Sequence, residues 1–448
     1  MPRYLPPLLT FILGGIVAIQ LFPSEQAAVT DQLAGFPDSD FFTQALRPWI
    51  IAFLSFMPFI AALAYSLGST FDRYLTRQFL SIFFISLSAL AGIWLLIDLG
   101  ENISDFKGVE NRFLTIIAYY SQWSPAILMV ILPYALLLAL INGLGKLSKS
   151  NEIIAMIQSG TGVIRVSAPL IFAGFWSALF LTCLNYHWAP GAESKRDEML
   201  ARAKGQPIYQ ATNVLYRNPG SPRLWLVGAF PEDYQKNGRI EKVEVTTIRA
   251  DGTIEGRLSS ERAQWDRNSR EWTFEKPLIA HFSVGKSPRF EQLDQDLVFK
   301  NWRETPQQII KPGLSVENLG IPEISTWLAS PLAQQTLSNK ISYLTHWHYR
   351  WSLPFTCVVT VLLAAPLSIH FTRRGNGSGI FLAVALSVVM IFVSSVSLTF
   401  GEANLLSPML AAWLPNLCFG LAGLWLYQRR VSGLPIYQGF KQLINPNS

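Results

Sequence analysis

The sequence has little charge and very little cysteine for its length. Only 15% of its 448 residues are Asp, Glu, Lys or Arg, whereas an ordinary soluble chain has about 25%. Half of the residues are hydrophobic and the mean hydropathy is +0.27, which excludes a typical soluble enzyme and a disordered chain. The three cysteines, Cys183, Cys357 and Cys418, all lie in apolar stretches. They cannot form a disulfide scaffold, and we expect all three to pack as small apolar side chains.

The sequence also lacks the motifs of a self-powered transporter or a metalloenzyme. Residues 143–146, GLGK, do not have the spacing of a phosphate-binding loop. The apolar stretches carry almost no ionisable residues, which disfavours a proton-coupled transporter and a passive channel. His346 and His348 could ligate zinc from a strand, but among neighbouring aromatic residues an interfacial belt is the favoured interpretation. We therefore expect no cofactor, no metal and no enzymatic activity, so that energy for any transport comes from a partner.

The charge that is present is confined to one part of the chain. Between Trp188 and Tyr343 lie 21 of the 36 Lys and Arg and 19 of the 30 Asp and Glu. A helix needs about 20 apolar residues to cross a bilayer, and eight charge-free stretches are long enough. They are Tyr4–Ser24, Pro48–Phe71, Gln78–Ile97, Phe113–Gly145, Val166–Ala192, Trp351–Thr372, Gly375–Gly401 and Ala403–Gln428. The pattern predicts a membrane protein with about eight transmembrane helices and one inserted water-soluble domain.

The basic residues in the short loops predict the orientation, because Lys and Arg near helix ends are retained in the cytoplasm. With the N-terminus inside, eleven flank the inner side: Arg3, Arg73, Arg77, Lys146, Lys149, Arg165, Arg373, Arg374, Arg429, Arg430 and Lys441. The short outer loops hold only Arg47, Lys107 and Arg112. Both termini are thus expected in the cytoplasm and the charged domain outside. The first stretch could instead be a cleaved signal peptide, but residues 24–28, SEQAA, are a poor cleavage site and favour a retained helix.

The inserted domain has the sequence pattern of antiparallel β structure. Four runs fit half-buried strands, at 224–227, 240–245, 271–274 and 297–299. Asn237-Gly238 and Asp251-Gly252 predict tight hairpins. The pattern is typical of a β sandwich or roll. After Pro312 the apolar residues take helical spacing, which predicts a helical return to the membrane.

A short polar segment on the inner side, Gly145–Gly162, predicts one amphipathic helix between two spans. Asn151 could cap its start, Glu152 suits the helix dipole, and Gly160 could end it. Such a helix could dock into a groove of a soluble ATPase, or it could be an ordinary capped loop on the membrane surface. The residues alone leave both interpretations open.

The stretch that contains this helix, Leu132–Gly162, resembles the hallmark of the LptF/LptG permease family, the membrane subunits of the lipopolysaccharide export ABC transporter. It reads LPYALLLALINGLGKLSKSNEIIAMIQSGTG. Further similarities are DRYL at 72–75, Pro190, SERAQW at 260–265, EWTF at 271–274, RRG at 373–375 and AAWLPN at 411–416. Together they cover about Phe71–Arg430. The segment 72–74 slightly favours an LptG-like subunit, and the residues do not specify which lipid is carried.

This resemblance implies an α-helical polytopic protein of the bacterial inner membrane with a periplasmic antiparallel β-jellyroll inserted between two groups of three spans. The expected division is an extra transmembrane hairpin at 1–66, the first half with the coupling helix near 150–160 at 67–190, the β-jellyroll with its helical return at 191–345, three helices at 346–430 and a cytoplasmic tail at 431–448.

The function implied is that of a permease subunit without its own ATPase site. It would extract lipopolysaccharide or a related glycolipid from the inner membrane and pass it to a periplasmic bridge. The implied partners are a cytoplasmic ABC ATPase dimer, a homologous second permease, a periplasmic jellyroll bridge protein, the lipid and the membrane, with no nucleic acid. The alternative is a non-transporting scaffold that holds a periplasmic β domain for envelope assembly.

Two sets of residues are the expected sites. The resemblance implies that the coupling helix contacts the ATPase, through Asn151, Glu152, Ile153, Ala155, Met156 and Gly160. Candidates for binding lipid head-group phosphates are Lys107, Arg112 and Arg350, although basic residues at helix ends also serve as plain interfacial anchors. The chain departs from the family in two ways, since Ile157 stands where a basic residue is common and residues 1–66 lie outside the usual pattern.

Overall fold

A computed structural model describes most of the chain. The described residues are 4–35, 40–109, 111–205, 207–217, 221–231, 233–249, 251–266, 269–282, 287–300, 302, 304–310, 313–329, 337–369 and 377–433. The expected flanking residues Arg3, Arg373, Arg374 and Lys441, the RRG segment and the tail beyond 433 lie outside them.

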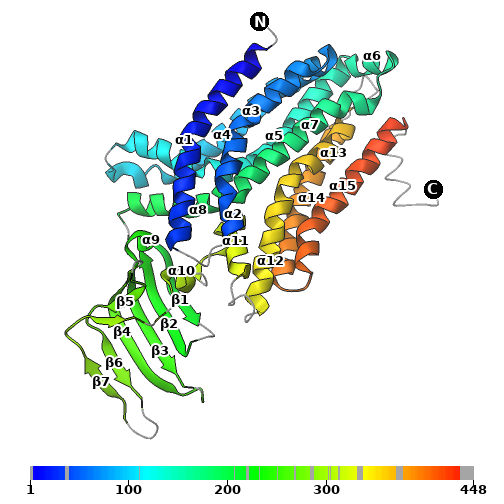
Figure 1. Ribbon diagram of the computed structural model, residues 1–448. Coiled ribbons are helices and arrows are strands. Elements are labelled where there is room, and N and C mark those ends of the chain that lie inside the picture. The colour runs from blue at the N-terminus through cyan, green and yellow to red at the C-terminus, as the bar shows by residue number, and fades with distance from the viewer. Residues whose placement is uncertain are drawn as a thin grey trace.

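Eight helices of the described chain are long and apolar enough to cross a membrane, which confirms the predicted number. They are α1 (Leu5–Gly35), α3 (Arg47–Leu67), α4 (Thr70–Asn102), α5 (Arg112–Lys149), α7 (Val163–Tyr186), α12 with α13 (Leu337–Ser352 and Thr356–Ser368), α14 (Gly377–Glu402) and α15 (Pro408–Val431). The short helix α6 (Glu152–Gln158) lies at one end of this bundle and the β domain at the other (Figure 1). We call these the α6 end and the β-domain end. Helix α1 begins and α15 ends at the α6 end.

Local sequence signals explain where several helices begin and break. Ser69 and Asp72 form a reciprocal capping box at the start of α4. Pro354 lies in a 3₁₀ turn, Leu353–Phe355, that separates α12 from α13. The sixth span begins at Lys340, well before the predicted start at Trp351. The prediction excluded Arg350 because it is charged, whereas Arg350 lies within α12.

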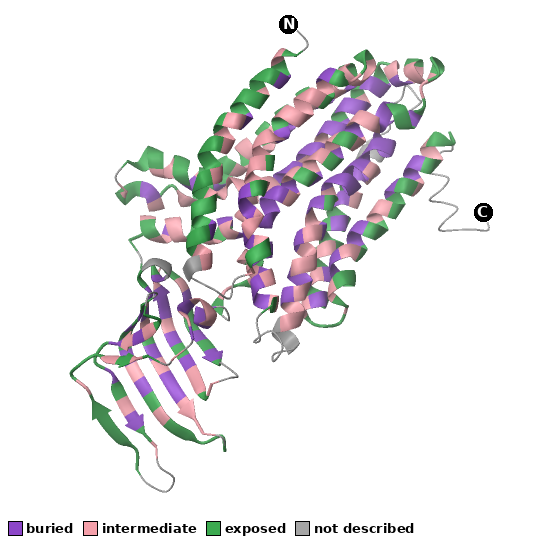
Figure 2. Cartoon of the chain, viewed as in Figure 1, coloured by how far each residue is buried: buried purple, intermediate pink, exposed green. Residues whose placement is uncertain are grey.

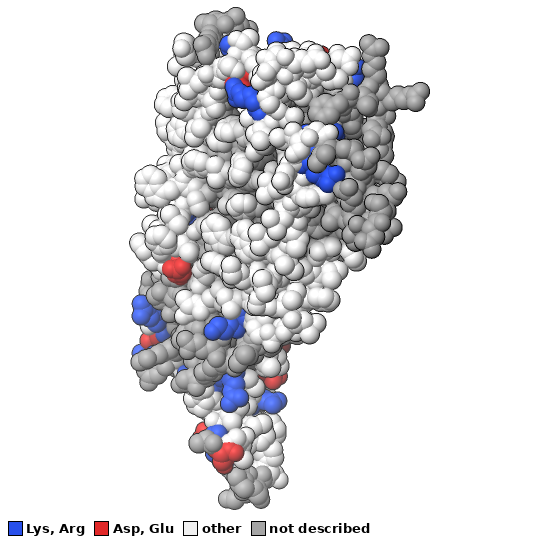
Figure 3. All heavy atoms as spheres, turned by 90° about the vertical axis from the view of Figure 1, so that its right-hand side faces the viewer, with Lys and Arg blue, Asp and Glu red and all other residues white. Residues whose placement is uncertain are grey.

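The centre of the bundle is formed mainly by α5, α7 and α13. Leu136 and Leu140 of α5 and Val361 of α13 are completely buried there. Buried residues face the interior of the bundle and exposed ones its outside (Figure 2). On the face shown in Figure 3, a broad middle zone has almost no charge, whereas charged side chains gather toward both ends. This distribution is that of a multi-pass membrane protein.

Two cysteines match the packing prediction and one does not. Cys183 and Cys357 are buried, but Cys418 is exposed on the outside of α15. An apolar side chain facing lipid gains as much as one in the interior, so position in a charge-free stretch cannot tell the two apart.

The charged part of the chain forms an antiparallel sheet, as predicted. Its strands are β1 (Tyr209–Arg217), β2 (Arg223–Pro231), β3 (Arg239–Ile248), β4 (Ile254–Asp266), β5 (Glu271–Phe274), β6 (Leu278–His281), β7 (Arg289–Gln292) and β8 (Leu297–Phe299). The order is β1-β2-β3-β4-β5-β8, and β6 pairs with β4 and β7. The long strand β4 thus pairs with β5 through its last residues and with β6 through its first, so that the sheet divides into two branches.

An aromatic core holds this domain together. Trp225, Trp272 and Phe274 have no exposed surface, and the two indole rings lie 5.0 Å apart. The short helix α10 (Pro306–Ile310) adds Ile309 and Ile310 to the same core. The Nε1 of Trp272 donates to the carbonyl of Glu304 at 2.7 Å, which fixes the segment that leaves the sheet.

One of the two predicted hairpin turns is wrong. Asn237 does not form a two-residue turn with Gly238 but ends a single helical turn, α9 (Tyr234–Asn237), which Gly238 closes at φ 65°. A Cβ at Gly238 would lie 2.1 Å from the carbonyl oxygen of Trp265. Asp251-Gly252 does form the turn between β3 and β4, where Asp251 accepts from the amide of Thr253 at 2.9 Å.

Candidate coupling helix and polar clusters

Helix α6 connects α5 to α7 at the α6 end. Asn151 stands directly before it, as predicted, but in a left-handed conformation at φ 59° and without a side-chain hydrogen bond to the helix. The expected side-chain cap is therefore wrong. Gly160 follows the helix at φ 93° with open space around it, which is the conformation that ends a helix at glycine.

The Glu152 carboxylate joins α6 to another part of the bundle. One oxygen accepts from the hydroxyl of Tyr74, on α4, at 2.6 Å, and the other from the hydroxyl of Ser150 at 2.8 Å. Tyr74 is 46% exposed, so the contact lies at the surface. Because the two residues are 78 positions apart in the sequence, this bond links the start of the third span to α6.

The two faces of α6 differ in burial. Ile153 is completely buried in the core of the bundle. Met156 and Ile157 are half-buried and pack against the same core. Ala155 and Gln158 are exposed. The helix is thus anchored by its apolar side and leaves the other side open to a partner.

An ion pair forms a second contact between helices at the α6 end of the bundle. Arg165 of α7 forms a 2.8 Å ion pair with Asp72 of α4. Asp72 also serves the capping box with Ser69. Both ion-pair partners are partly exposed, so the pair contributes little stability, but it fixes how α4 and α7 meet beside α6.

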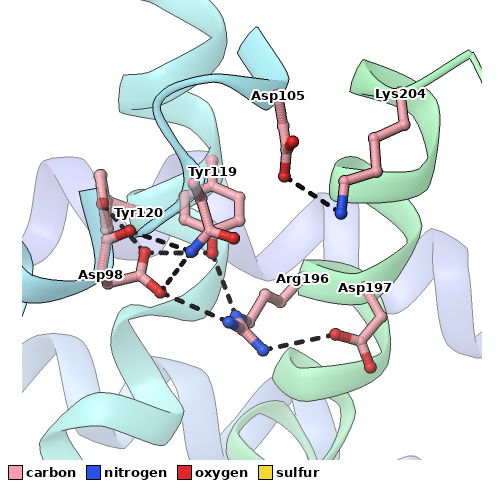
Figure 4. Close-up of polar contacts among 8 residues, drawn as sticks. Asp98, Asp105, Tyr119, Tyr120, Arg196, Asp197 and Lys204 are labelled. Atoms are coloured by element: carbon pink, nitrogen blue, oxygen red, sulfur yellow. Dashed lines mark hydrogen bonds and ion pairs between the residues drawn. The ribbon is translucent and has the colours of Figure 1, made fainter. Parts of the chain in front are cut away.

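A polar cluster lies at the β-domain end, where α8 (Trp188–Ala203) crosses α5 (Figure 4). We call Asp98, Asn102, Tyr119, Tyr120 and Arg196 the Asp98 cluster. The Asp98 carboxylate, 7% exposed, accepts from both tyrosine hydroxyls at 3.2 and 3.0 Å and from the amide of Asn102 at 3.0 Å. Both carboxylate oxygens of Asp98 therefore accept hydrogen bonds from side chains of the protein itself.

Arg196 brings α8 into this cluster. Its Nε donates to the Tyr119 hydroxyl at 3.1 Å, and its Nη2 lies 3.4 Å from Asp98. The guanidinium also stacks 4.3 Å from the ring of Trp123. Burial lowers the pKa of Arg196, but the Tyr119 hydrogen bond and the nearby carboxylates outweigh it and raise this pKa above its ordinary value. The cluster thus holds the helix that leads to the β domain against two spans.

Of the three expected head-group cations, Arg112 and Arg350 have side-chain hydrogen bonds within the protein. Lys107 is exposed in the 3₁₀ turn η1 (Asp105–Gly108). Arg112 is exposed as well, but its guanidinium donates to the carbonyls of Phe106 and Lys107 at 3.0 and 2.8 Å.

Arg350 is only 8% exposed, unlike a residue at a membrane surface. Its guanidinium donates to the carbonyls of Leu319 and Glu317 and to the amide oxygen of Asn185. A buried guanidinium needs such partners, because it cannot lose its proton. The contacts place Arg350 as a link between α12, α7 and the helical return.

The first histidine of the segment 346–348, a zinc candidate by sequence, lies inside the bundle. His346, 3% exposed on α12, pairs with the carboxylate of Glu402 at the end of α14. Side chains two positions apart on a helix diverge, so His348 does not join it as a zinc ligand, and no group of three metal-binding side chains is found among the described residues. The interpretation of His346 as a residue of an interfacial belt is wrong, since its ring is buried and hydrogen-bonded to Glu402.

Sequence reasoning missed the partners in these clusters. Asp98 and Glu402 stand at the ends of charge-free stretches, which is a visible signal of charge near the membrane. Their partners Arg196 and His346 are 98 and 56 positions away, and one sequence gives no means of pairing them.

The comparison with protein families agrees with this architecture. Residues 73–429 match the family described as lipopolysaccharide export system permease LptF/LptG. No curated protein matches the chain. The matched region includes α6, the β domain and six of the eight spans, but not α1 and α3. The match covers well over half of the sequence, and the chain therefore belongs to the LptF/LptG family of lipopolysaccharide export permeases.

Proposed function

We propose that this chain is one of two homologous permeases that extract lipopolysaccharide or a related glycolipid from the bacterial inner membrane, driven by a separate cytoplasmic ATPase dimer. The family match over residues 73–429 carries this proposal. It includes the segment 145–162, which joins two spans through α6.

In the proposed orientation the α6 end faces the cytoplasm and the β domain the periplasm. The positive-inside rule supports it. The described basic residues in or beside the short connections at the α6 end are Arg73, Arg77, Lys146, Lys149, Arg165, Arg429 and Arg430. Those in or beside the short connections at the β-domain end are Arg47, Lys107 and Arg112, while Lys340 and Arg350 lie in the first part of the sixth span.

Helix α6 would be the contact for the ATPase. Its exposed side, with Ala155 and the neighbouring Glu152, would meet the partner, while Ile153 and Met156 hold the helix in the bundle. A displacement of α6 would reach α4 through the bond between Glu152 and Tyr74. It would reach α5 and α7 through the chain itself, since α6 directly connects them.

At the other end, the lipid would pass to the β domain and then to a periplasmic bridge protein. Strand β7 pairs only with β6 among the described strands, and all four of its residues are exposed. Such an edge can accept a strand of another jellyroll. Among the three cations considered for lipid phosphates, Lys107 is favoured, because the guanidinium groups of Arg112 and Arg350 already bind carbonyls of the chain.

Purification of the tagged chain in a mild detergent tests this assembly. The proposal expects two companions, a P-loop ATPase and a second permease. A scaffold without transport function would instead yield envelope proteins and no ATPase. Photocrosslinking from position 290, where Phe290 is 65% exposed on β7, should capture a periplasmic jellyroll, and capture from exposed positions on other strands alone would contradict the docking edge.

A further inference from the structure

A large cavity lies between the added N-terminal hairpin and the family core. It has a volume of about 1150 Å³ and is lined by α3, α4, α5 and α7. Ligand pockets for small molecules usually measure roughly 300–1,000 Å³, so this one has room for more than a single acyl chain. The helices α1 and α3 lie outside the matched family region, so one wall of the cavity is an addition to the family core.

The cavity is apolar and runs from a buried floor to an exposed rim. Met57, Phe79 and Leu132 on its lining are at most 5% exposed, whereas Phe84 and Phe172 are 58% and 48% exposed. A cavity with this gradient in a membrane-spanning bundle is open to hydrocarbon at its rim. The occupant that suits it is a lipid tail.

The charges on the lining lie at one end, beside α6. Arg73 and Arg77 follow each other by one turn near the start of α4, and Arg165 lies at the start of α7. Asp72 is the opposing carboxylate there, and it is paired with Arg165. Three cations against one paired anion leave an excess of positive charge beside an apolar cavity.

We propose that this cavity binds one anionic glycerophospholipid, with its acyl chains between α3 and the core and its phosphate at Arg77. The guanidinium of Arg73 already donates to the Ser69 carbonyl and the Thr70 hydroxyl, so Arg73 contributes positive charge beside the phosphate. Basic residues beside spans attract anionic lipids, and guanidinium groups bind phosphate through paired hydrogen bonds. The assignment to the cytoplasmic leaflet rests on the proposed orientation. The bound lipid would fill the gap where α3 meets α4 and α7 and so fasten the added hairpin to the permease.

Tryptophan quenching tests the site, because Trp176 of α7 lines the cavity. The full chain is reconstituted into phosphatidylcholine vesicles that contain a small fraction of phosphatidylglycerol with brominated acyl chains. The difference in fluorescence between the wild type and Trp176→Phe isolates the signal of this residue. We expect that signal to be quenched in a saturable manner by the brominated phosphatidylglycerol and not by an equal fraction of brominated phosphatidylcholine. Soluble glycerol phosphate should not reverse it, which separates a lipid from a free phosphate.

Three variants of the chain sharpen the test. Arg77→Gln should weaken the apparent affinity about fivefold, the ratio that corresponds to ~1 kcal/mol per basic residue near anionic lipid. Lys149→Gln removes an exposed cation from the same end but not from the cavity lining, and should leave the affinity unchanged. Ala61→Phe, on α3, should fill the cavity and abolish the saturable quenching, with size-exclusion behaviour as the check of folding.

Equal quenching by the two brominated lipids, or equal affinities of Arg77→Gln and the wild type, would overturn the proposal. So would an unchanged signal in Ala61→Phe. None of these measurements requires export or an ATPase, so failure of the lipid site and failure of the proposed function are distinguishable.

Discussion

The hydroxyl of Tyr74 donates a 2.6 Å hydrogen bond to the carboxylate of Glu152. Through this bond, α4 holds the first residue of α6. The second carboxylate oxygen accepts from Ser150, so Glu152 is oriented from two sides although it lies at the surface. If an ATPase moves α6, the contact between Glu152 and Tyr74 can transmit this movement to α4.

We predict that Glu152→Lys abolishes lipopolysaccharide export while the protein still inserts and assembles. The new cation cannot accept the Tyr74 hydrogen bond, and it reverses the charge in the first turn of α6, where a negative charge suits the helix dipole. The measurement is lipid release together with ATPase activity of the assembled complex in vesicles.

Two milder variants separate the charge of Glu152 from its hydrogen bonds. Glu152→Gln keeps an acceptor for Tyr74 without the charge, and Tyr74→Phe removes only the donor. If the oriented carboxylate matters, both should reduce coupling less than Glu152→Lys does. Normal export by Glu152→Lys would refute the coupling role.

The large-scale organisation of this protein could be predicted because it depends on local composition. A charge-free run marks most of each span, and the four predicted strands lie in β2, β3, β5 and β8, so these elements can be recognised without knowing what packs against them. The strands β1, β4, β6 and β7 were not predicted. The same holds for α6, whose start at Glu152 and end before Gly160 are marked by the residues themselves.

Contacts between distant residues could not be predicted in this way. Arg350 has the sequence context of a surface anchor, yet it is buried because carbonyls of a segment some thirty residues earlier surround it. The cavity likewise depends on how four successive spans pack against one another. Such features depend on tertiary packing, which no local pattern encodes.

A second prediction compares two carboxylates that lie against one guanidinium. Asp98 is 7% exposed and Asp197 71% exposed, and both are within 3.5 Å of Arg196. Asp98→Asn should destabilise the fold by about 1–3 kcal/mol, because its amide turns a donor toward groups that themselves donate. Asp197→Asn should cost under about 1 kcal/mol. Thermal unfolding in detergent gives both values, and equal melting temperatures would show that the Asp98 cluster does not hold α8.

A third prediction concerns the contact between α7 and α13. A Cβ on Gly174 would lie 2.7 Å from Cγ2 of Val361, and valine in a helix has little rotamer freedom to yield. Gly174→Ala should therefore cost about 1–3 kcal/mol through overpacking. Adding Val361→Ala should recover part of this loss, as expected for residues in direct contact.

Gly92 offers the matched control for this substitution. It also lies in a span, on α4, but a Cβ there would have no neighbour within 4 Å. Gly92→Ala should leave the melting temperature nearly unchanged. If the two glycine variants melt alike, close packing at Gly174 is not what restricts the residue.

The last prediction is a pH dependence from the contact between His187 and Glu323, which joins the end of α7 to α11 (Ile321–Ala329). The two side chains lie 2.8 Å apart, and that of Glu323 is 22% exposed. Burial alone would raise the pKa of Glu323, but His187 and Arg47 outweigh it and hold this pKa below its ordinary value. The folded protein therefore binds fewer protons at this carboxyl than the unfolded chain does.

A lowered pKa contributes stability that is fully present above the unfolded value, about 4.3 for glutamate, and that is lost as the pH falls through the folded value. The melting temperature of the wild type in detergent should accordingly fall with acidification below about pH 5, and Glu323→Gln should show a shallower fall. Glu101→Gln, at an exposed position, is the control and should follow the wild type. Parallel curves for Glu323→Gln and the wild type would mean that this ion pair does not contribute to the acid sensitivity of the fold.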